Sequence, residues 1–192
     1  QTLSQRPSDV LKRVRAELAK GNPAAALSHL DRCLTISPQS SEVRLARGEI
    51  LLQMNRLDDA IRDLETACRD LPDDEQARML LIRAYSRRPQ TRQKARDVAA
   101  KWIAERPTDL QARLVLAGIE FEQGRFDEAL EAYSAASRMF PGNVESRLGH
   151  IFALCALGDY AAAREQFDEA LTVNPDSDDL KLNLARFLVT CT

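Results

Sequence analysis

The residues of this sequence with the most reactive side chains are two histidines and four cysteines, and their spacing does not favour catalysis or metal binding. His29 and His150 lie far apart, and no HExxH, Walker or GxGxxG motif accompanies them. The cysteines contain no CxxC pair, so neither a local zinc site nor a dense disulfide framework is predicted; they are Cys33, Cys68, Cys155 and Cys191. We therefore expect no enzyme, no cofactor and no bound metal.

Charge and hydropathy argue against two further classes of partner. The 192 residues carry a formal net charge of −2 and a sequence pI of about 5.8, so no overall positive field would attract nucleic acid. No apolar run approaches the roughly 18 residues that a membrane-crossing helix needs, so direct membrane insertion is not expected. Because the sequence begins with Gln1 rather than Met, we expect a fragment or a processed form. The sequence leaves the compartment unknown; we expect a soluble chain and favour the cytoplasm over the periplasm.

Three columns of residues recur through the chain with the same spacing. Successive members of each column are 34, 35, 34 and 34 residues apart. The prolines are Pro38, Pro72, Pro107, Pro141 and Pro175; the alanines are Ala26, Ala60, Ala95, Ala129 and Ala163; the basic residues are Arg44, Arg78, Arg113, Arg147 and Lys181. Three residue types in phase over five units predict an array of repeated structural elements.

Each unit is predicted to contain two helices, so the class is all-α. Gly21, Asn55, Gly124 and Gly158 share the slot that ends the first helix, where a positive φ is often needed, and the prolines end the second helix. Polar residues after the prolines are expected to cap the next helix; they are Ser40 or Ser41, Asp74, Asp109 and Asn143. The extra residue of the third unit is placed in residues 87–91, the break in its helical pattern.

The alanine column predicts how the two helices of a unit pack. Small residues let two helices approach closely, and the large residues of a neighbouring column then fill the core; they are Leu30, Leu64, Tyr133 and Phe167. The third unit has Ala99 in this column but carries Trp102 three residues later, on the same helix face. We expect these two positions to exchange volume, which cores tolerate well.

The quoted residues resemble the tetratricopeptide repeat (TPR) family, whose degenerate motif of about 34 residues ends in a closing proline. The fifth unit matches at Gly158, Tyr160, Ala163, Phe167, Ala170 and Pro175, the fourth at Ala117, Gly124, Phe126, Ala129, Tyr133, Ala136 and Pro141, and the second at Gly48, Leu57, Ala60, Leu64, Ala67 and Pro72. The resemblance implies an all-α, right-handed αα-superhelix, or solenoid. Its five TPR-like hairpins would span residues 7–175 (about 7–40, 41–74, 75–109, 110–143 and 144–177), followed by a terminal helix over 178–192 that looks like the first helix of a truncated sixth repeat.

In TPR proteins the first helices line a concave groove, so the resemblance implies which residues face a partner. The candidate partner-binding residues are Leu45, Glu49, Leu52, Gln53, Met79, Arg83, Arg87, Leu114, Phe121, Glu122, Leu148 and Phe152, and the same wall includes Glu42, Gln76 and Glu145. The apolar column through Leu45, Leu114 and Leu148 is better explained by contacts between neighbouring first helices. Phe121 and Phe152 are the better candidates for partner contact, because exposed aromatic residues are enriched at binding hot spots.

The function that the resemblance implies is a protein–protein interaction module that binds a peptide or an amphipathic helix of another protein in the groove. One alternative is an assembly or regulatory arm of a larger protein whose catalytic domain lies outside this sequence. Another is RNA recognition by a related helical repeat, which the acidic balance of the chain disfavours. Apolar residues spread around segment 180–191 also suggest self-association through the terminal helix, because a terminal cap normally has a polar outer face.

Overall fold

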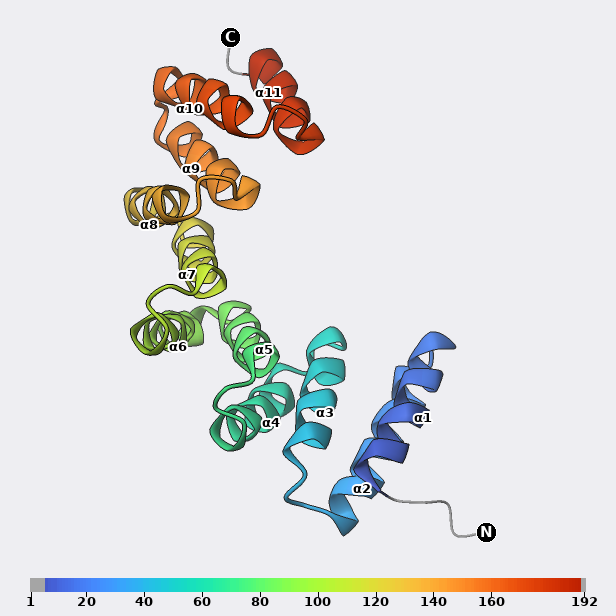
Figure 1. The fold of residues 1–192 in the computed structure, drawn as a ribbon. Coiled ribbons are helices and arrows are strands. Elements are labelled where there is room, and N and C mark those ends of the chain that lie inside the picture. The colour runs from blue at the N-terminus through green and yellow to red at the C-terminus, as the bar shows by residue number, and fades with distance from the viewer. Residues whose placement is uncertain (1–5, 191–192) are drawn as a thin grey trace. The chain divides into compact units, whose positions relative to one another are not determined.

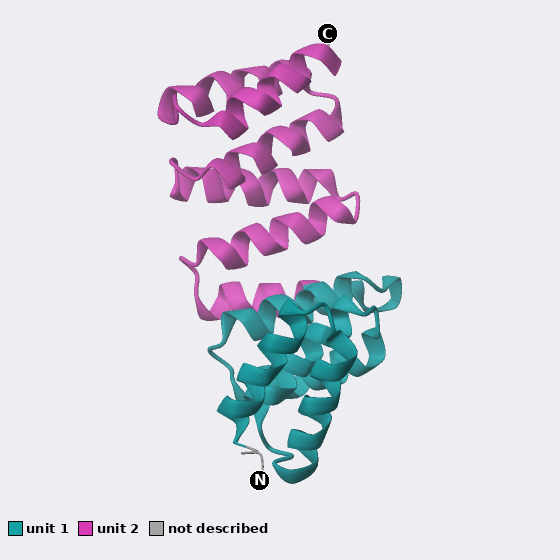
Figure 2. Ribbon diagram, turned by 90° about the vertical axis from the view of Figure 1, so that its right-hand side faces the viewer, with its two compact units in different colours: residues 1–95 teal, residues 96–192 magenta. Residues whose placement is uncertain are grey.

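The computed structural model describes residues 6–190, which form eleven α-helices and one short 3₁₀ helix and contain no β-strand (Figure 1). The prediction of an all-α class is therefore confirmed. The chain divides into two compact units, residues 1–95 and residues 96–192, which we call unit 1 and unit 2 (Figure 2). The five predicted repeat ranges stay a prediction.

Unit 1 is built from helices that pack on their neighbours in sequence. Its elements are α1 (Pro7–Ala19), α2 (Pro23–Ile36), α3 (Ser41–Gln53), α4 (Leu57–Asp70), α5 (Glu75–Ser86), the 3₁₀ helix η1 (Pro89–Thr91) and the first residues of α6 (Arg92–Glu105). Each of α1 to α4 packs against the next helix, and α3 also contacts both α1 and α5. The first helices of successive pairs thus lie side by side.

Unit 2 repeats the same plan. After the rest of α6 come α7 (Leu110–Glu122), α8 (Phe126–Met139), α9 (Val144–Leu157), α10 (Tyr160–Val173) and α11 (Asp178–Thr190). Each of α7 to α10 packs on the next helix, and α9 also contacts α7 and α11. Residues 191 and 192 of the predicted terminal helix, Cys191 included, lie outside the described residues.

The ends of the first helices follow the sequence prediction closely. Asn55 has φ 59°, and the three glycines of that slot have φ between 73° and 81°, the left-handed region that glycine enters without strain. They are Gly21, Gly124 and Gly158. Each ends a first helix, so the chain can turn at once into the second.

Three of the four predicted caps are present, and one is wrong. The side chains of Asp74, Asp109 and Asn143 each accept a hydrogen bond from a backbone N–H three residues later, at 2.9, 3.1 and 2.7 Å. Ser40 makes no such bond at the start of α3. The hydroxyl of Ser41 instead donates to Asp70 at 2.8 Å, which ties the start of α3 to the end of α4.

The arginine column has a structural role that the sequence only suggested. Each arginine donates to the carbonyl oxygen of the closing proline six residues earlier; the pairs are Arg44 and Pro38, Arg78 and Pro72, Arg113 and Pro107, and Arg147 and Pro141. The nitrogen–oxygen distances are 2.7, 3.0, 3.1 and 2.7 Å. The arginine of one repeat therefore binds a backbone carbonyl in the turn that leads from the preceding helix into its own helix.

The small-against-large core is confirmed. All five alanines of the alanine column are fully buried, as are Leu30 and Leu64, and Phe167 exposes only 1% of its surface. In the third repeat both Ala99 and Trp102 are fully buried, as the exchange of volume between these positions requires. Tyr133 differs, because it keeps part of its surface accessible.

The extra residue of the third repeat lies where it was predicted. It falls in the connection between α5 and α6, which contains the 3₁₀ helix η1. The Thr91 hydroxyl donates to the carbonyl of Tyr85 at 2.8 Å and so closes this longer turn.

The terminal helix α11 buries one face and exposes the others. Leu180 is fully buried and Phe187 nearly so, with the Phe187 ring centroid 5.4 Å from that of Phe167. Leu182 and Val189 expose 51% and 82% of their surface. Self-association through this helix stays a prediction.

Candidate functional site

Unit 1 has a groove on the side formed by its first helices. It encloses a cavity of about 400 Å³ lined by α1, α3 and Gln76 of α5. Its walls are Leu11, Val14, Arg15, Leu18, Glu42, Leu45, Ala46, Glu49, Ile50, Gln53 and Gln76. Three residues of the predicted partner-binding set, Leu45, Glu49 and Gln53, therefore meet in one cavity, which we call the unit 1 groove.

Unit 2 has a second groove on the corresponding side. A cavity of about 500 Å³ lies mainly on one face of α9, with one residue from α8 and one from α11. It is lined by Tyr133, Asn143, Val144, Glu145, Leu148, Gly149, Phe152 and Asp179. Leu148 and Phe152 belong to the predicted set, and Phe152 exposes 42% of its surface. We call this cavity the unit 2 groove.

Two of the predicted groove residues are buried instead, which corrects their placement. Leu52 exposes 2% of its surface and Leu114 exposes 5%. Ile50 and Leu51, the two residues before Leu52, are buried as well. These consecutive residues can all be buried because α3 is contacted by α1, α2, α4 and α5. A partner chain needs accessible surface, so neither leucine is retained as a partner-binding residue.

Five predicted residues do not line either groove in the described part of the chain. Met79 is half-buried, whereas Arg83, Arg87 and Glu122 are exposed. Arg87 is also engaged, since it donates to the carbonyl of Leu52 at 2.7 Å. The ring of Phe121 packs edge-on against Phe126, with centroids 5.3 Å apart at 62°, so it belongs to its own hairpin.

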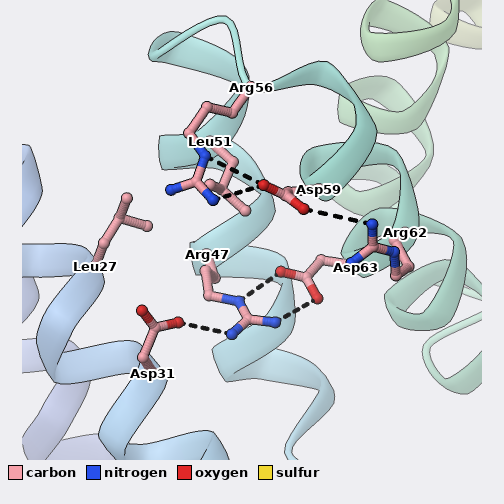
Figure 3. A pocket seen from close by; sticks show the side chains of 8 residues that line it. All are labelled: Leu27, Asp31, Arg47, Leu51, Arg56, Asp59, Arg62 and Asp63. Atoms are coloured by element: carbon pink, nitrogen blue, oxygen red, sulfur yellow. Dashed lines mark hydrogen bonds and ion pairs between the residues drawn. The ribbon is translucent and has the colours of Figure 1, made fainter.

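Sequence reasoning missed an ion network in unit 1 that centres on one buried carboxylate, Asp63. Asp63 exposes only 2% of its surface and accepts two hydrogen bonds from Arg47, at 2.6 and 2.8 Å (Figure 3). Arg47 also donates to Asp31 at 2.7 Å, and Arg44 reaches Asp63 at 3.4 Å. The hydrogen bond to Asp63, followed by that to Asp31, raises the pKa of Arg47 above its ordinary value despite burial.

This network surrounds a small cavity of about 170 Å³, and its charges satisfy one another. Besides Asp31, Arg47 and Asp63, the walls include Arg56, which donates to Asp59. Asp59 also pairs with Arg62 at 3.4 Å. Through Asp31, Arg47 and Asp63 the network joins α2, α3 and α4. Removing Arg47 would take away the closest compensating charge of buried Asp63, so its role is structural.

Unit 2 contains a similar buried carboxylate at a different repeat position. Glu120 exposes 3% of its surface where other repeats have Leu51, Tyr85 and Leu154. Its carboxylate accepts from Arg96 at 2.6 Å and also pairs with Arg125. Each unit thus stabilises one buried carboxylate with arginines from neighbouring elements.

Burial shifts the pKa values of two thiols and one histidine that the sequence singled out. Burial raises the pKa of Cys68 to about 11 and also raises the pKa of Cys33, so both thiols stay protonated near neutral pH. Burial lowers the pKa of His150 below its ordinary value.

Among the described residues no group of three or more His, Cys, Asp or Glu side chains could hold a metal ion. Within residues 6–190, no helix is both long and apolar enough to cross a membrane.

Comparison with known proteins decides the family. Models of the family described as Tetratricopeptide repeat match residues 17–84 and 120–169 in one case and residues 92–144 and 153–190 in another. The chain belongs to the tetratricopeptide repeat family. Tetratricopeptide repeats serve as protein–protein interaction modules, and this TPR chain has the accessible grooves that such a module needs.

Two similar proteins are much longer than this TPR chain. It is 27% identical over 179 residues to the human Protein O-mannosyl-transferase TMTC1, covering 86% of this chain but 19% of that protein. It is 39% identical over 72 residues to the Protein CTR9 homolog of Arabidopsis thaliana, covering 37% of this chain and 7% of that protein. The chain thus spans less than a fifth of the length of either relative.

Solved structures share the fold at low sequence identity. MamA matches with a TM-score of 0.71 and 21% identity over 88% of this chain and 91% of its own. A tetratricopeptide repeat protein from Parabacteroides merdae matches with a TM-score of 0.77 and 16% identity over 96% and 73%. YrrB, described as a TPR protein with an unusual peptide-binding site, matches with a TM-score of 0.65 and 16% identity over 95% and 93%. The fold class predicted from sequence, an all-α TPR superhelix, is confirmed.

Proposed function

We propose that this TPR chain binds a peptide or an amphipathic helix of a partner protein in the grooves formed by its first helices. The observation that carries the proposal is Phe152, an aromatic side chain that exposes 42% of its surface in the wall of the unit 2 groove. A large apolar ring left accessible forgoes the stabilisation that burial would give, and aromatic residues of this kind are enriched among binding hot spots at interfaces.

The composition of the two grooves suits a polypeptide. Each has an apolar centre, around Leu45 in unit 1 and around Leu148 and Phe152 in unit 2, with polar side chains at its margin. An amphipathic helix buries its apolar face in such a groove and leaves its polar face outside. The partner-binding residues of the proposal are the accessible members of the predicted set that line a groove, namely Leu45, Glu49, Gln53, Leu148 and Phe152.

Other ligands find less support in these grooves. The lining of the unit 2 groove includes Glu145 and Asp179, whose negative charges repel the phosphates of a nucleic acid. The name of the TMTC1 relative suggests a transferase with an arm like this chain, but no feature of the described residues favours that alternative. The similarity to YrrB agrees with peptide binding, although that protein shares only the fold.

Selection of peptides from a displayed random library on the intact chain tests the proposal. Peptides that bind the wild-type chain are expected to lose about tenfold or more in affinity with Phe152→Ala, because truncating an aromatic hot spot typically costs more than 1 kcal/mol. The matched control is Val173→Ala, since Val173 exposes 46% of its surface on the second helix α10. Circular dichroism would confirm that both variants fold.

Unchanged affinity in the groove variants would show that the grooves do not bind the peptides. If the selected peptides bind Phe152→Ala and Leu45→Ala as tightly as the wild-type chain, they bind elsewhere and the proposal is wrong. If Val173→Ala weakens them as much as Phe152→Ala, the binding surface lies on the second helices.

A further inference from the structure

The unit 2 groove carries negative charge that no described residue of its lining compensates. Glu145 of α9 and Asp179 of α11 line it, and none of its eight lining residues is a lysine, arginine or histidine. Within residues 6–190, neither carboxylate forms an ion pair or a side-chain hydrogen bond with another described residue. Both lie in the first turn of a helix, where the helix dipole favours an acidic side chain, so their presence alone does not require a ligand.

Tyr133 shows that this negative charge extends over the groove. Burial raises the pKa of Tyr133 above its ordinary value, and the charges of Glu145 and Glu122 raise it further. Glu122 ends α7 and has no helix-dipole reason to be acidic, because carboxylates are disfavoured at that end. The field at the groove therefore comes from three helices.

The ring of Tyr133 reaches the groove through a gap left by two glycines. A Cβ atom added to Gly149 would lie 2.3 Å from the Tyr133 ring, and one added to Gly118 would lie 3.6 Å from its hydroxyl oxygen. Tyr133 thus crosses from α8 to the side of the first helices, where it joins Phe152 in the lining of the groove. Two aromatic rings and two carboxylates then share one cavity.

A lysine or arginine side chain matches this combination of surfaces. Its aliphatic stem buries apolar area while its charged end stays among polar groups. Aromatic faces attract the cation, and each carboxylate gains a charge-assisted hydrogen bond. The cavity of about 500 Å³ is large enough for such a side chain together with part of its backbone.

The unit 1 groove lacks this selectivity. Its carboxylates, Glu42 and Glu49, lie beside Arg15, and the amide of Gln76 donates to Glu49 at 3.4 Å. Its lining has no aromatic residue. A cationic side chain would meet a positive charge there, so the preference is expected in unit 2 alone.

We infer that the unit 2 groove recognises a lysine or arginine of the partner peptide, with the aliphatic stem against Leu148 and Phe152 and the positive charge between Glu145 and Asp179. This inference rests on the proposed function and adds the chemistry of the partner to it.

Two synthetic amphipathic helical peptides of equal length test the inference. One contains only leucine and lysine, and the other has glutamate in place of every lysine. Fluorescence anisotropy at one fixed ionic strength would measure their affinity for the intact chain. The leucine–lysine peptide is expected to bind the wild-type chain about tenfold or more tightly than its counterpart.

A matched pair of charge variants separates a specific site from general attraction. The groove variant Glu145→Gln/Asp179→Asn is expected to lose about tenfold in affinity for the leucine–lysine peptide. The control Glu131→Gln/Glu165→Gln removes the same charge from exposed positions on α8 and α10 and is expected to keep that affinity. The conservative variant Glu145→Asp/Asp179→Glu should retain most of the binding.

Three outcomes would overturn the inference. They are equal affinity for both peptides, equal loss in the groove and control variants, and no binding of the leucine–lysine peptide. Failure of this inference can be distinguished from failure of the proposed function, in which selected peptides would bind Phe152→Ala as tightly as the wild-type chain. If library-selected peptides without lysine or arginine still depend on Phe152, the groove binds peptides and only the preference for a cation is wrong.

Discussion

The two grooves occupy corresponding positions in their units, but their walls differ in kind. The same repeat position holds Arg15 and Glu49 in the unit 1 groove and Phe152 in the unit 2 groove, and in the other repeats it holds Arg83 and Gly118. The alanine column, in contrast, is fully buried in all five repeats. Positions that pack the hairpins are therefore restricted, whereas positions that face the groove vary freely and can encode different partners.

A second comparison concerns the side chain behind each groove. Leu64 and Tyr133 belong to the same column, and each lies against a glycine of a first helix, Gly48 and Gly149 respectively. Leu64 is fully buried and ends in the core. Tyr133 is longer and reaches the lining of the unit 2 groove. One repeat position thus serves only the core in unit 1 and both core and groove in unit 2.

The largest difference between these two residues should appear in stability. Leu64→Ala is expected to lower the free energy of unfolding by about 2–5 kcal/mol, because it leaves a cavity in a closed core. Tyr133→Phe should cost less than about 1 kcal/mol, since its hydroxyl makes no hydrogen bond with another described residue. Urea unfolding followed by circular dichroism measures both changes. Equal losses would show that the two side chains do the same structural work.

A smaller effect of opposite signs is expected at two glycines of unit 2. Gly149→Ala should destabilise the chain by about 1–3 kcal/mol, because the new methyl group would lie 2.3 Å from the Tyr133 ring. Gly118→Ala should stabilise it by about 0.5–1 kcal/mol, because its nearest contact, at 3.6 Å, is ordinary and alanine favours a helix. Thermal unfolding of the two variants checks the contrast. Stabilisation by both would mean that Tyr133 does not press against α9.

The smallest effect is a pH dependence at Tyr133. Its pKa is raised in the folded chain, so the folded state favours the protonated phenol. This contribution is complete below the unfolded pKa of about 10 and is lost as the pH rises through the folded value. Tyr133→Phe should therefore lose less stability than the wild-type chain between neutral and alkaline pH, as urea unfolding at a series of pH values would measure.

Tyr160→Phe is the control for this titration, because Tyr160 exposes 46% of its surface. If Tyr133→Phe loses as much stability at alkaline pH as the wild-type chain and Tyr160→Phe lose, the phenol of Tyr133 does not titrate with folding. The assignment of a buried phenol to the unit 2 groove would then be wrong.

Features that depend on a single helix end or on one repeated contact could be predicted from the sequence. Asn55 was placed at a positive φ without being a glycine, since it shares a slot with three glycines. The closing prolines and the arginines six residues later also recur in phase, although the carbonyl that each arginine binds appears only in the structure. Repetition thus provides an internal check that a single occurrence would not.

Features that require three or more helices could not be predicted. Ile50, Leu51 and Leu52 are consecutive and all buried, so periodicity could not show which of them faces the groove. Asp63 is polar in sequence, but Arg47 reaches it from α3 and also donates to Asp31 of α2. The sequence predicts Tyr133 in the core. Its place in the groove lining could not be predicted, because it depends on two glycines in other helices, Gly118 and Gly149. Burial that depends on several neighbours is therefore decided only by the folded chain.

Amide NMR spectra of the intact chain with a library-selected peptide would show whether a partner chain lies against the first helices. Saturating peptide is expected to shift signals of residues in α9 and at the start of α11, with Leu148 and Phe152 among the largest, and to leave the exposed face of α10 unchanged. Shifts concentrated on α8 and α10, with those of Leu148 and Phe152 unmoved, would contradict the account.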